Sequence, residues 1–252
     1  MGTIIAFANQ KGGVAKTTST YNVGVSLARK GKKTLIIDLD SQASLTISAG
    51  LEPFDYENTI VSVLRKNGVA IEKCTLSLQE NLKICPSRLE LAQLEMEMIG
   101  RSMREMILKR ALEPIRNDYD FILIDCPPQL SILTINALAC SDFVIVPVKT
   151  DYLAYRGVEL LMESIQDIKD LINPGLSVLG IVATMYEQRV KDDNDILQAL
   201  RDKYEVIGVI KKRAVAKKGV YDGLSVGEQD AKNDVATEYN KISDYVIQNG
   251  RK

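Results

Sequence analysis

The residues with the strongest chemical signature follow a short apolar segment near the start of the chain. They form one uninterrupted run: Lys11, Gly12, Gly13, Val14, Ala15, Lys16, Thr17 and Thr18. Consecutive glycines let a backbone turn approach phosphate oxygens closely and surround them with N–H groups. A helix that begins near Lys16 adds its positive end, the lysine supplies charge for the β- and γ-phosphates, and the Thr17 hydroxyl can bind Mg²⁺. We therefore predict a phosphate-binding loop for a nucleoside triphosphate and Mg²⁺.

This loop departs from the common pattern G-x-x-x-x-G-K-[ST], because the two glycine positions hold Gln10 and Ala15. We expect the methyl group of Ala15 to be tolerated in a helical backbone conformation. A glycine-rich turn with solvated lysines is the alternative. The strand before the run and the helix that starts at Lys16 favour the phosphate site.

Aspartates end two further apolar segments. Asp38 and Asp40 close the second segment, and Asp125 closes the segment Phe121–Ile124. Side chains two apart on a strand point the same way, and two carboxylates facing a polyphosphate repel it unless Mg²⁺ or water lies between. We therefore predict a Mg²⁺ site formed by Thr17, Asp38, Asp40 and Asp125, with Asp125 acting through a water molecule. The alternative for Asp38 and Asp40 is capping of the next helix.

Composition narrows the chemistry further. The 252 residues include no histidine, which excludes a Ser-His-Asp triad and a His-ligated metal. The four cysteines form no C-x-x-C pair, so free thiols in a reducing cytoplasm are expected. The net charge of -1 requires any nucleic-acid contact to be a local basic patch. With no signal peptide and no apolar run of roughly 18 residues, we expect a cytoplasmic protein without a membrane partner.

Apolar segments alternate with helix-like segments along the chain. The strands are predicted at Thr3–Ala8, Thr34–Asp38, Leu82–Pro86, Phe121–Asp125, Phe143–Val148, Val178–Ala183 and Val206–Ile210. The helices are predicted at Thr17–Lys30, Leu89–Ile115, Leu130–Ala139, Val158–Leu171, Asp193–Lys203 and Asn233–Ile247. This alternation predicts an α/β fold with a doubly wound, mainly parallel sheet and helices on both faces. We expect one domain over residues 1–252, with a mixed pattern at Gly50–Glu80 and no readable strand order.

The phosphate loop carries a second lysine, Lys11, five positions before Lys16. The run K-G-G-x-x-K-T-T resembles the deviant Walker A box of the ParA/MinD group of P-loop ATPases. The resemblance implies ATP as the nucleotide and a sandwich dimer in which Lys11 reaches the partner's ATP. A lysine serving its own site or the solvent is the alternative.

The two carboxylate segments extend this resemblance. Asp38–Ala43 is similar to the group's D-x-D-P-Q-[GA] segment, with Ser41 in the place of proline. The similarity implies that Asp40 orients the hydrolytic water and that Asp38 holds the switch region near the metal. The run after Asp125 resembles the group's second switch. The implied catalytic residues are thus Lys11, Lys16 and Asp40.

The C-terminal third decides the branch of the group. Arg189 matches a DNA-contacting arginine of Soj-like ParA proteins, and five further cations follow: Lys211, Lys212, Arg213, Lys217 and Lys218. Such a cluster neutralises DNA phosphates without reading bases, although a basic loop can also be plain solvated surface. The resemblance implies a DNA-segregation ATPase on the nucleoid, stimulated by a ParB-like partner. The alternatives are a MinD-like positioning protein that never binds DNA, and a metabolic ligase with an added small-molecule pocket.

Overall fold

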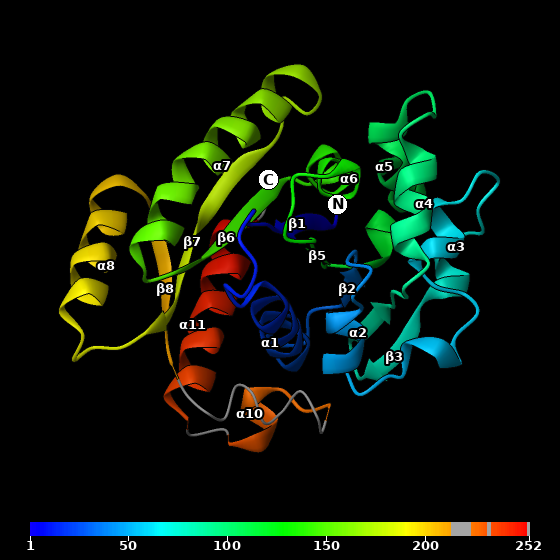
Figure 1. Cartoon of the computed structure of the whole chain (residues 1–252). Helices are drawn as coiled ribbons and strands as arrows, with labels where there is room; N and C mark the ends of the chain where they lie inside the picture. Colours follow the sequence, from blue (N-terminus) through cyan, green and yellow to red (C-terminus); the bar gives the residue numbers. More distant parts are fainter. Residues whose placement is uncertain (213–222, 231–232, 251–252) are drawn as a thin grey trace.

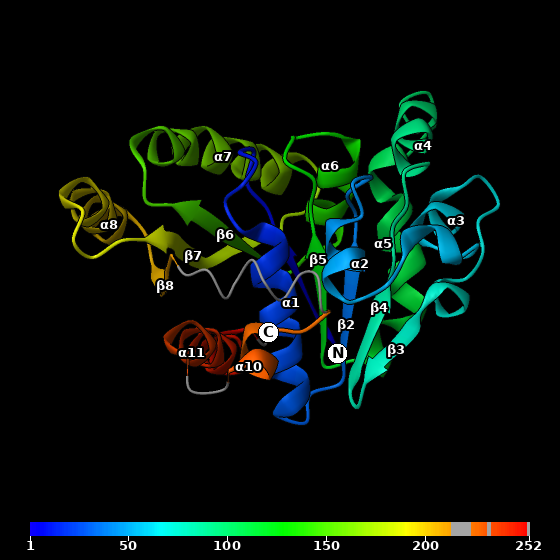
Figure 2. The ribbon, with the colours of Figure 1, turned by 60° about the horizontal axis from the view of Figure 1, so that its bottom comes forward.

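A computed structural model describes residues 1–212, 223–230 and 233–250. They form a twisted sheet between two layers of helices (Figures 1 and 2). The strands are β1 Thr3–Phe7, β2 Thr34–Asp38, β3 Leu76–Gln79, β4 Leu82–Cys85, β5 Phe121–Asp125, β6 Phe143–Lys149, β7 Ser177–Tyr186 and β8 Val206–Lys211. Their order in the sheet is β3-β4-β2-β5-β1-β6-β7-β8, and every pair except β3 with β4 is parallel. The predicted fold class is confirmed.

The helices differ in length and in the face they cover. They are α1 Lys16–Arg29, α2 Ser44–Ser48, α3 Ile60–Leu64, α4 Leu91–Met98, α5 Ile107–Leu112, α6 Ile132–Cys140, α7 Tyr152–Leu171, α8 Lys191–Lys203, α10 Val226–Gln229 and α11 Asp234–Asn249. Short 3-10 segments lie at Pro53–Asp55, Ile71–Cys74, Arg104–Met106 and Glu113–Asp118.

Two hydrophobic cores fill the space between the sheet and its helices. Alternate residues of each central strand point to opposite faces: Ile4 belongs to one core and Ile5 to the other. Helices α3 to α8 bury their apolar sides in the first core, whereas α1, α2, α10 and α11 cover the second. Both faces are therefore covered, which explains why the parallel strands are almost continuously apolar.

The prediction of one helix over Leu89–Ile115 is wrong. The segment contains α4, a 3-10 turn and α5, because the helical conformation is interrupted between Gly100 and Met103. Met103 has a φ of 55°, which a right-handed helix cannot contain. The periodic apolar residues that suggested one helix belong to two, and both bury them in the same core.

Two other differences have local causes. Strand β3 lies in the mixed segment Gly50–Glu80 and was not predicted; its residues are only partly buried and it pairs with β4 alone, at the sheet edge. Helix α7 begins at Tyr152 rather than Val158, because the Asp151 side chain accepts a hydrogen bond from Ala154 N and caps it.

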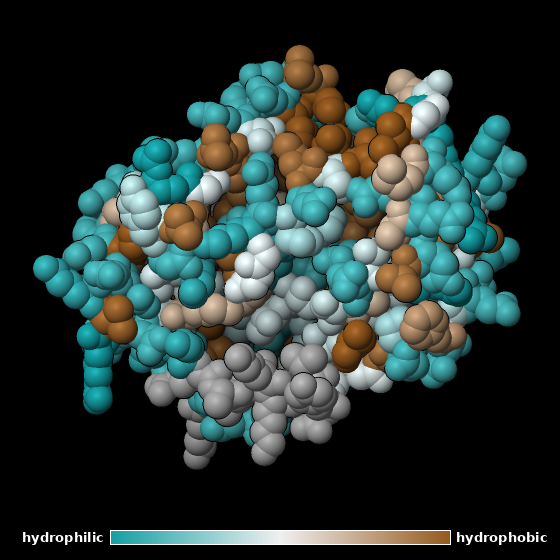
Figure 3. Space-filling model, viewed as in Figure 1, coloured by the Kyte–Doolittle hydropathy of each residue, from teal (hydrophilic) through white to brown (hydrophobic). Residues whose placement is uncertain are grey.

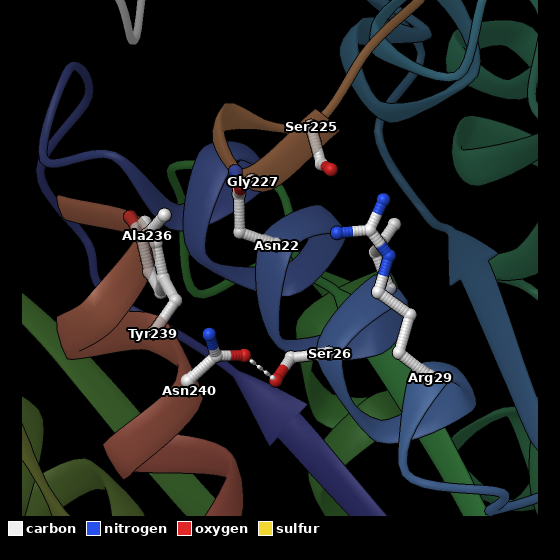
Figure 4. A pocket seen from close by; sticks show the side chains of 9 residues that line it. Asn22, Ser26, Arg29, Ser225, Gly227, Ala236, Tyr239 and Asn240 are labelled. Carbon is white, nitrogen blue, oxygen red and sulfur yellow. Dashed lines mark hydrogen bonds between the residues drawn. The ribbon is translucent and has the colours of Figure 1, made fainter. Parts of the chain in front are cut away.

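Polar contacts join α1 to the C-terminal helices. Figure 4 shows a small pocket between α1, α10 and α11, where Ser26 Oγ donates to Asn240 Oδ1 at 2.6 Å. Nearby, Asn22 Oδ1 accepts from Val226 N at 2.8 Å. The helix that starts at the phosphate loop is thus held against α10 and α11.

Within the described ranges, no helix combines the length and the apolar character that crossing a membrane requires.

Candidate nucleotide-binding site

The carboxyl ends of three adjacent strands place the predicted residues at one edge of the sheet. Asp125 is in register with Phe7 of β1 on one side and with Asp38 of β2 on the other. The phosphate loop leaves β1 at this edge, where ligands of doubly wound folds bind. The structure therefore brings together the loop, Asp38 and Asp125, which lie far apart in the sequence.

Two buried side chains fix the loop. Asn9 donates through Nδ2 to the Pro147 carbonyl at 2.7 Å, and its Oδ1 accepts from Lys11 N at 2.9 Å. Thr184 donates through Oγ1 to the Val14 carbonyl at 3.1 Å. Strands β6 and β7 thus support the loop from one side. Sequence reasoning missed Asn9, although it lies only two residues before Lys11.

The expectation that Ala15 has a helical backbone conformation is wrong. Ala15 is the N-cap of α1 and has φ 61° and ψ 34°, in the left-handed region that favours glycine. The loop must reverse direction at this point before the first turn of the helix, which is why the common pattern has glycine here.

The loop borders an open cleft of about 460 Å³. Its lining residues come from the loop, α1, the segment from Asp40 through α2, and the ends of β5 and β7: Gly12, Gly13, Ala15, Lys16, Thr17, Thr18, Asp40, Ser44, Ile47, Ser48, Pro128 and Met185. The volume lies in the usual range for small-molecule sites. Asp40 is the acidic residue among these lining residues, so it is the carboxylate placed to contact a ligand.

Lys16 and Asp125 form the buried floor of the site. The Lys16 side chain is 7% exposed, and Nζ donates to the Lys11 carbonyl at 3.2 Å. Burial lowers the pKa of Lys16, while burial and then the neighbouring Asp38 raise the pKa of Asp125. Both charges are thus poorly solvated. Phosphate oxygens would pair with Lys16 and a cation would pair with Asp125. These partners would compensate for the hydration that both groups lose by burial.

The donors fit Mg²⁺. Thr17 Oγ1 donates to Asp125 Oδ2 at 2.6 Å, at the start of the helix that follows the loop. A hydroxyl, a carboxylate and substrate phosphates are the oxygen ligands that Mg²⁺ uses in nucleotide sites, usually with several waters. Thr17 could therefore hold the ion directly, with Asp125 behind it. The wider predicted set of Thr17, Asp38, Asp40 and Asp125 stays a prediction.

Asp38 and Asp40 have different surroundings despite their spacing. Asp38 is completely buried, and burial raises its pKa to about 6 despite hydrogen bonds from Thr46 and from Asp40 N. Asp40 is partly exposed at the cleft, and its Oδ1 accepts from Gln42 N at 2.9 Å. The structure thus places Asp40 at the cleft and Asp38 beneath it.

Lys11 points away from its own cleft. Its Nζ contacts Asp151 Oδ1 at 3.0 Å, and Lys149 Nζ contacts the other oxygen of the same carboxylate at 3.1 Å. The Lys11 side chain is 38% exposed, so it is available at the surface. The two lysines of the loop therefore have separate environments, one buried and one outside.

The described part of the basic region lies beside the turn after β7. Arg189 is exposed between β7 and α8, and Lys212 Nζ pairs with Glu187 at 2.6 Å in the same turn. Lys211 pairs with Asp234 at 3.3 Å. Such exposed pairs contribute little energy and exchange readily for another anion. The three other predicted DNA contacts, Arg213, Lys217 and Lys218, lie outside the described residues.

A parallel sheet, a glycine turn leading into a helix, an internal lysine and a Thr17–Asp125 pair define a P-loop nucleotide-binding protein. Residues 2–178 match the family model described as an AAA domain. The chain is 38% identical over 201 residues to the sporulation initiation inhibitor protein Soj of Bacillus subtilis, covering 80% of this chain and 79% of that protein. It is 35% identical over 257 residues to the chromosome-partitioning ATPase Soj of Treponema pallidum, covering 98% of both.

A solved structure with a bound nucleotide shares the fold. Cobyrinic acid a,c-diamide synthase from Mycobacterium smegmatis, with bound ADP and magnesium, is 33% identical with a TM-score of 0.86. The alignment covers 100% of this chain and 98% of that one. The chain belongs to the ParA/Soj/MinD family of P-loop ATPases, so the resemblance stated from the sequence is confirmed.

Proposed function

We propose that this chain is a DNA-segregation ATPase that works as a nucleotide-dependent switch. With ATP it forms a sandwich dimer and binds DNA without sequence preference. It releases the DNA when a ParB-like partner stimulates ATP hydrolysis. The observation that carries the proposal is the different placement of the two loop lysines. Lys16 is buried at the cleft, whereas Lys11 lies outside it with its amine at the surface.

The position of Lys11 supports the dimer. A cation that serves its own nucleotide would be expected at the cleft, but Lys11 is not among the cleft-lining residues and its amine contacts Asp151. A partner's nucleotide is the anion that would draw it away. Figure 3 also shows hydrophobic side chains gathered over α6 and the adjoining part of α7, and α7 leaves Leu153, Leu160 and Leu171 exposed. Exposed apolar surface of this kind marks interaction faces.

The roles of the other residues follow from their surroundings. The loop N–H groups and Lys16 bind the phosphates, and Thr17 with Asp125 holds Mg²⁺, which would neutralise phosphate charge when bound. Asp40 accepts a hydrogen bond from the attacking water and orients it. With no histidine in the chain, this carboxylate at the cleft is the group available for that task.

Two relatives named as Soj proteins favour DNA as the partner, one of them named a chromosome-partitioning ATPase. Arg189 and Lys212 lie together at the surface, and the basic segment continues from there along the sequence. DNA contact by such residues is electrostatic and therefore salt-sensitive. We place the DNA-binding face at Arg189 and the segment 211–218.

The test is a gel-shift assay on non-specific duplex with ATP, with ADP and without nucleotide. We expect ATP-only binding that is lost in Lys11→Ala and kept or prolonged in Asp40→Ala. The double variant Lys217→Glu, Lys218→Glu should lose DNA but still dimerise. Lys66→Glu, Lys73→Glu carries the same charge change on exposed residues elsewhere and should bind normally. Absence of DNA binding by the wild-type protein with ATP would refute the proposal.

The relative named as a diamide synthase favours a second candidate, an ATP-dependent amide ligase. Such an enzyme would need a carboxylic acid substrate beside the γ-phosphate. The same preparations can be assayed for ATP turnover with cobyrinic acid and an amine donor. Turnover stimulated by these compounds and not by DNA would support the ligase.

A further inference from the structure

Asp38 is a buried carboxylate that does not reach the cleft. Its Oδ2 accepts from Thr46 N at 2.8 Å and from Thr46 Oγ1 at 2.7 Å, and its Oδ1 accepts from Asp40 N at 3.2 Å. Asp38 and Thr46 are both 0% exposed. The carboxylate therefore ties the backbone of Asp40 to the first turn of α2.

The direction of the Thr46 hydroxyl is fixed by a third element. Ser87 N, which follows β4, donates to Thr46 Oγ1 at 2.9 Å. Ser87 N can only donate, so it occupies an acceptor position of the Thr46 oxygen. The single hydroxyl proton of Thr46 is therefore donated to Asp38. Thr46 thus joins the end of β2, the helix α2 and the loop after β4 in one buried network, which low dielectric strengthens.

The network ends at Asp40, which faces the cleft. Asp40 lines the cleft, and its local turn is closed by Gln42 N on Oδ1 at 2.9 Å and by Ala43 N on the Asp40 carbonyl at 3.0 Å. Two buried contacts hold this turn beyond β2: Leu39 N donates to the Asp125 carbonyl at 3.1 Å, and the Asp38 side chain accepts from Asp40 N. The second contact acts on Asp40 itself. The position of the Asp40 carboxylate therefore depends on the side chain that orients Asp38.

We propose that Thr46 is a positioning residue for ATP hydrolysis, which holds the Asp40 carboxylate at the cleft through Asp38. This inference rests on the proposed function, in which Asp40 orients water. Without the Thr46 hydroxyl, Asp38 loses one of three hydrogen bonds and Ser87 N loses its acceptor. The Asp40 turn can then move, and a displacement of about 1 Å at a reacting group costs on the order of 100-fold in rate.

The effect should be confined to the chemical step. The phosphate loop is anchored by Asn9 and Thr184, on the other side of the cleft from α2. The described hydrogen bonds of Thr46 involve neither anchor, and loss of the hydroxyl leaves the cleft-lining α2 residues Ser44, Ile47 and Ser48 unchanged, so we expect nucleotide binding to be preserved. This separation predicts a fall in kcat with little change in KM or in the Kd for a non-hydrolysable ATP analogue.

The experiment compares Thr46→Val with Thr46→Ser at a temperature well below both unfolding midpoints. Valine keeps the shape and removes the hydroxyl, and we expect kcat to fall by about 10- to 100-fold. Serine keeps the hydroxyl and should restore most of kcat. Thr59→Val is the matched control: Thr59 is equally buried and caps α3 through Val61 N, away from the cleft. It should lower stability but leave kcat unchanged.

Two results would overturn the inference. One is a Thr46→Val enzyme with wild-type kcat, and the other is an equal loss of kcat in Thr46→Val, Thr46→Ser and Thr59→Val. Asp40→Ala separates this failure from failure of the proposed function. If Asp40→Ala hydrolyses ATP like the wild type, the role of Asp40 itself is wrong. If only Thr46→Val is unaffected, the role of Thr46 alone is wrong.

Discussion

Ala15 has a backbone conformation that costs an alanine energy. Its φ of 61° brings Cβ close to the following carbonyl, at a cost of about 1–2 kcal/mol that glycine avoids. Glycine loses more chain entropy on folding, by roughly 0.5–1 kcal/mol. The two terms oppose each other, and the strain is the larger. Ala15 therefore stores a small amount of strain at the phosphate loop.

We predict that Ala15→Gly stabilises the protein by about 0.5–1 kcal/mol. Urea unfolding followed by circular dichroism measures this. Ala28→Gly is the control, because Ala28 lies inside α1 with its side chain buried. That change should destabilise by about 1 kcal/mol or more. Equal destabilisation by both variants would contradict the strain at residue 15.

At the scale of elements, close packing between helix α1 and the sheet limits the size of the side chain at position 24. A Cβ on Gly24 would lie 2.7 Å from Ile36 Cγ2, in the buried contact between α1 and β2. The missing side chain lets the helix approach the strand. This approach places the phosphate loop at the carboxyl ends of the central strands. Alanine has the better helix propensity by about 1 kcal/mol, but overpacking typically costs 1–3 kcal/mol.

Gly24→Ala should therefore be destabilising, by about 0–2 kcal/mol net. Ile36→Ala removes the Cγ2 methyl group that the new Cβ would meet, so Gly24→Ala should cost less in the Ile36→Ala background than in the wild type. Urea unfolding of the two single variants and of the double variant gives the coupling between the two sites. If the two changes are simply additive, the contact does not limit the approach of α1.

The sequence was informative where one local rule decides the structure. Buried parallel strands are apolar throughout, so seven strands and the loop between β1 and α1 could be located. Strand β3 was missed, because a half-exposed edge strand has no such pattern. The break at Met103 depends on a single backbone conformation that its residue type does not reveal. Thr46 and Asp151 were missed as well, because their importance comes from contacts with residues distant in the chain.

At the scale of the whole molecule, dimerisation requires Lys11 to break its ion pair with Asp151 before it can reach the partner's nucleotide. In the free chain its amine pairs with Asp151, which also caps α7 and pairs with Lys149. An exposed pair of this kind is worth about 0.2–1 kcal/mol. Two are broken in a symmetric dimer, so the free chain is favoured by a total of about 0.4–2 kcal/mol.

Asp151→Asn should therefore strengthen ATP-dependent dimerisation by about 2- to 30-fold in Kd. Asparagine keeps the N-cap of α7, so the change removes charge and little else. Sedimentation velocity with Mg²⁺ and a non-hydrolysable ATP analogue measures the constant. Lys149→Ala is the opposing control: it leaves Lys11 as the main partner of Asp151 and should not strengthen the dimer. If Asp151→Asn dimerises no better than wild type while Lys11→Ala does not dimerise, Asp151 does not compete with the partner's nucleotide for Lys11.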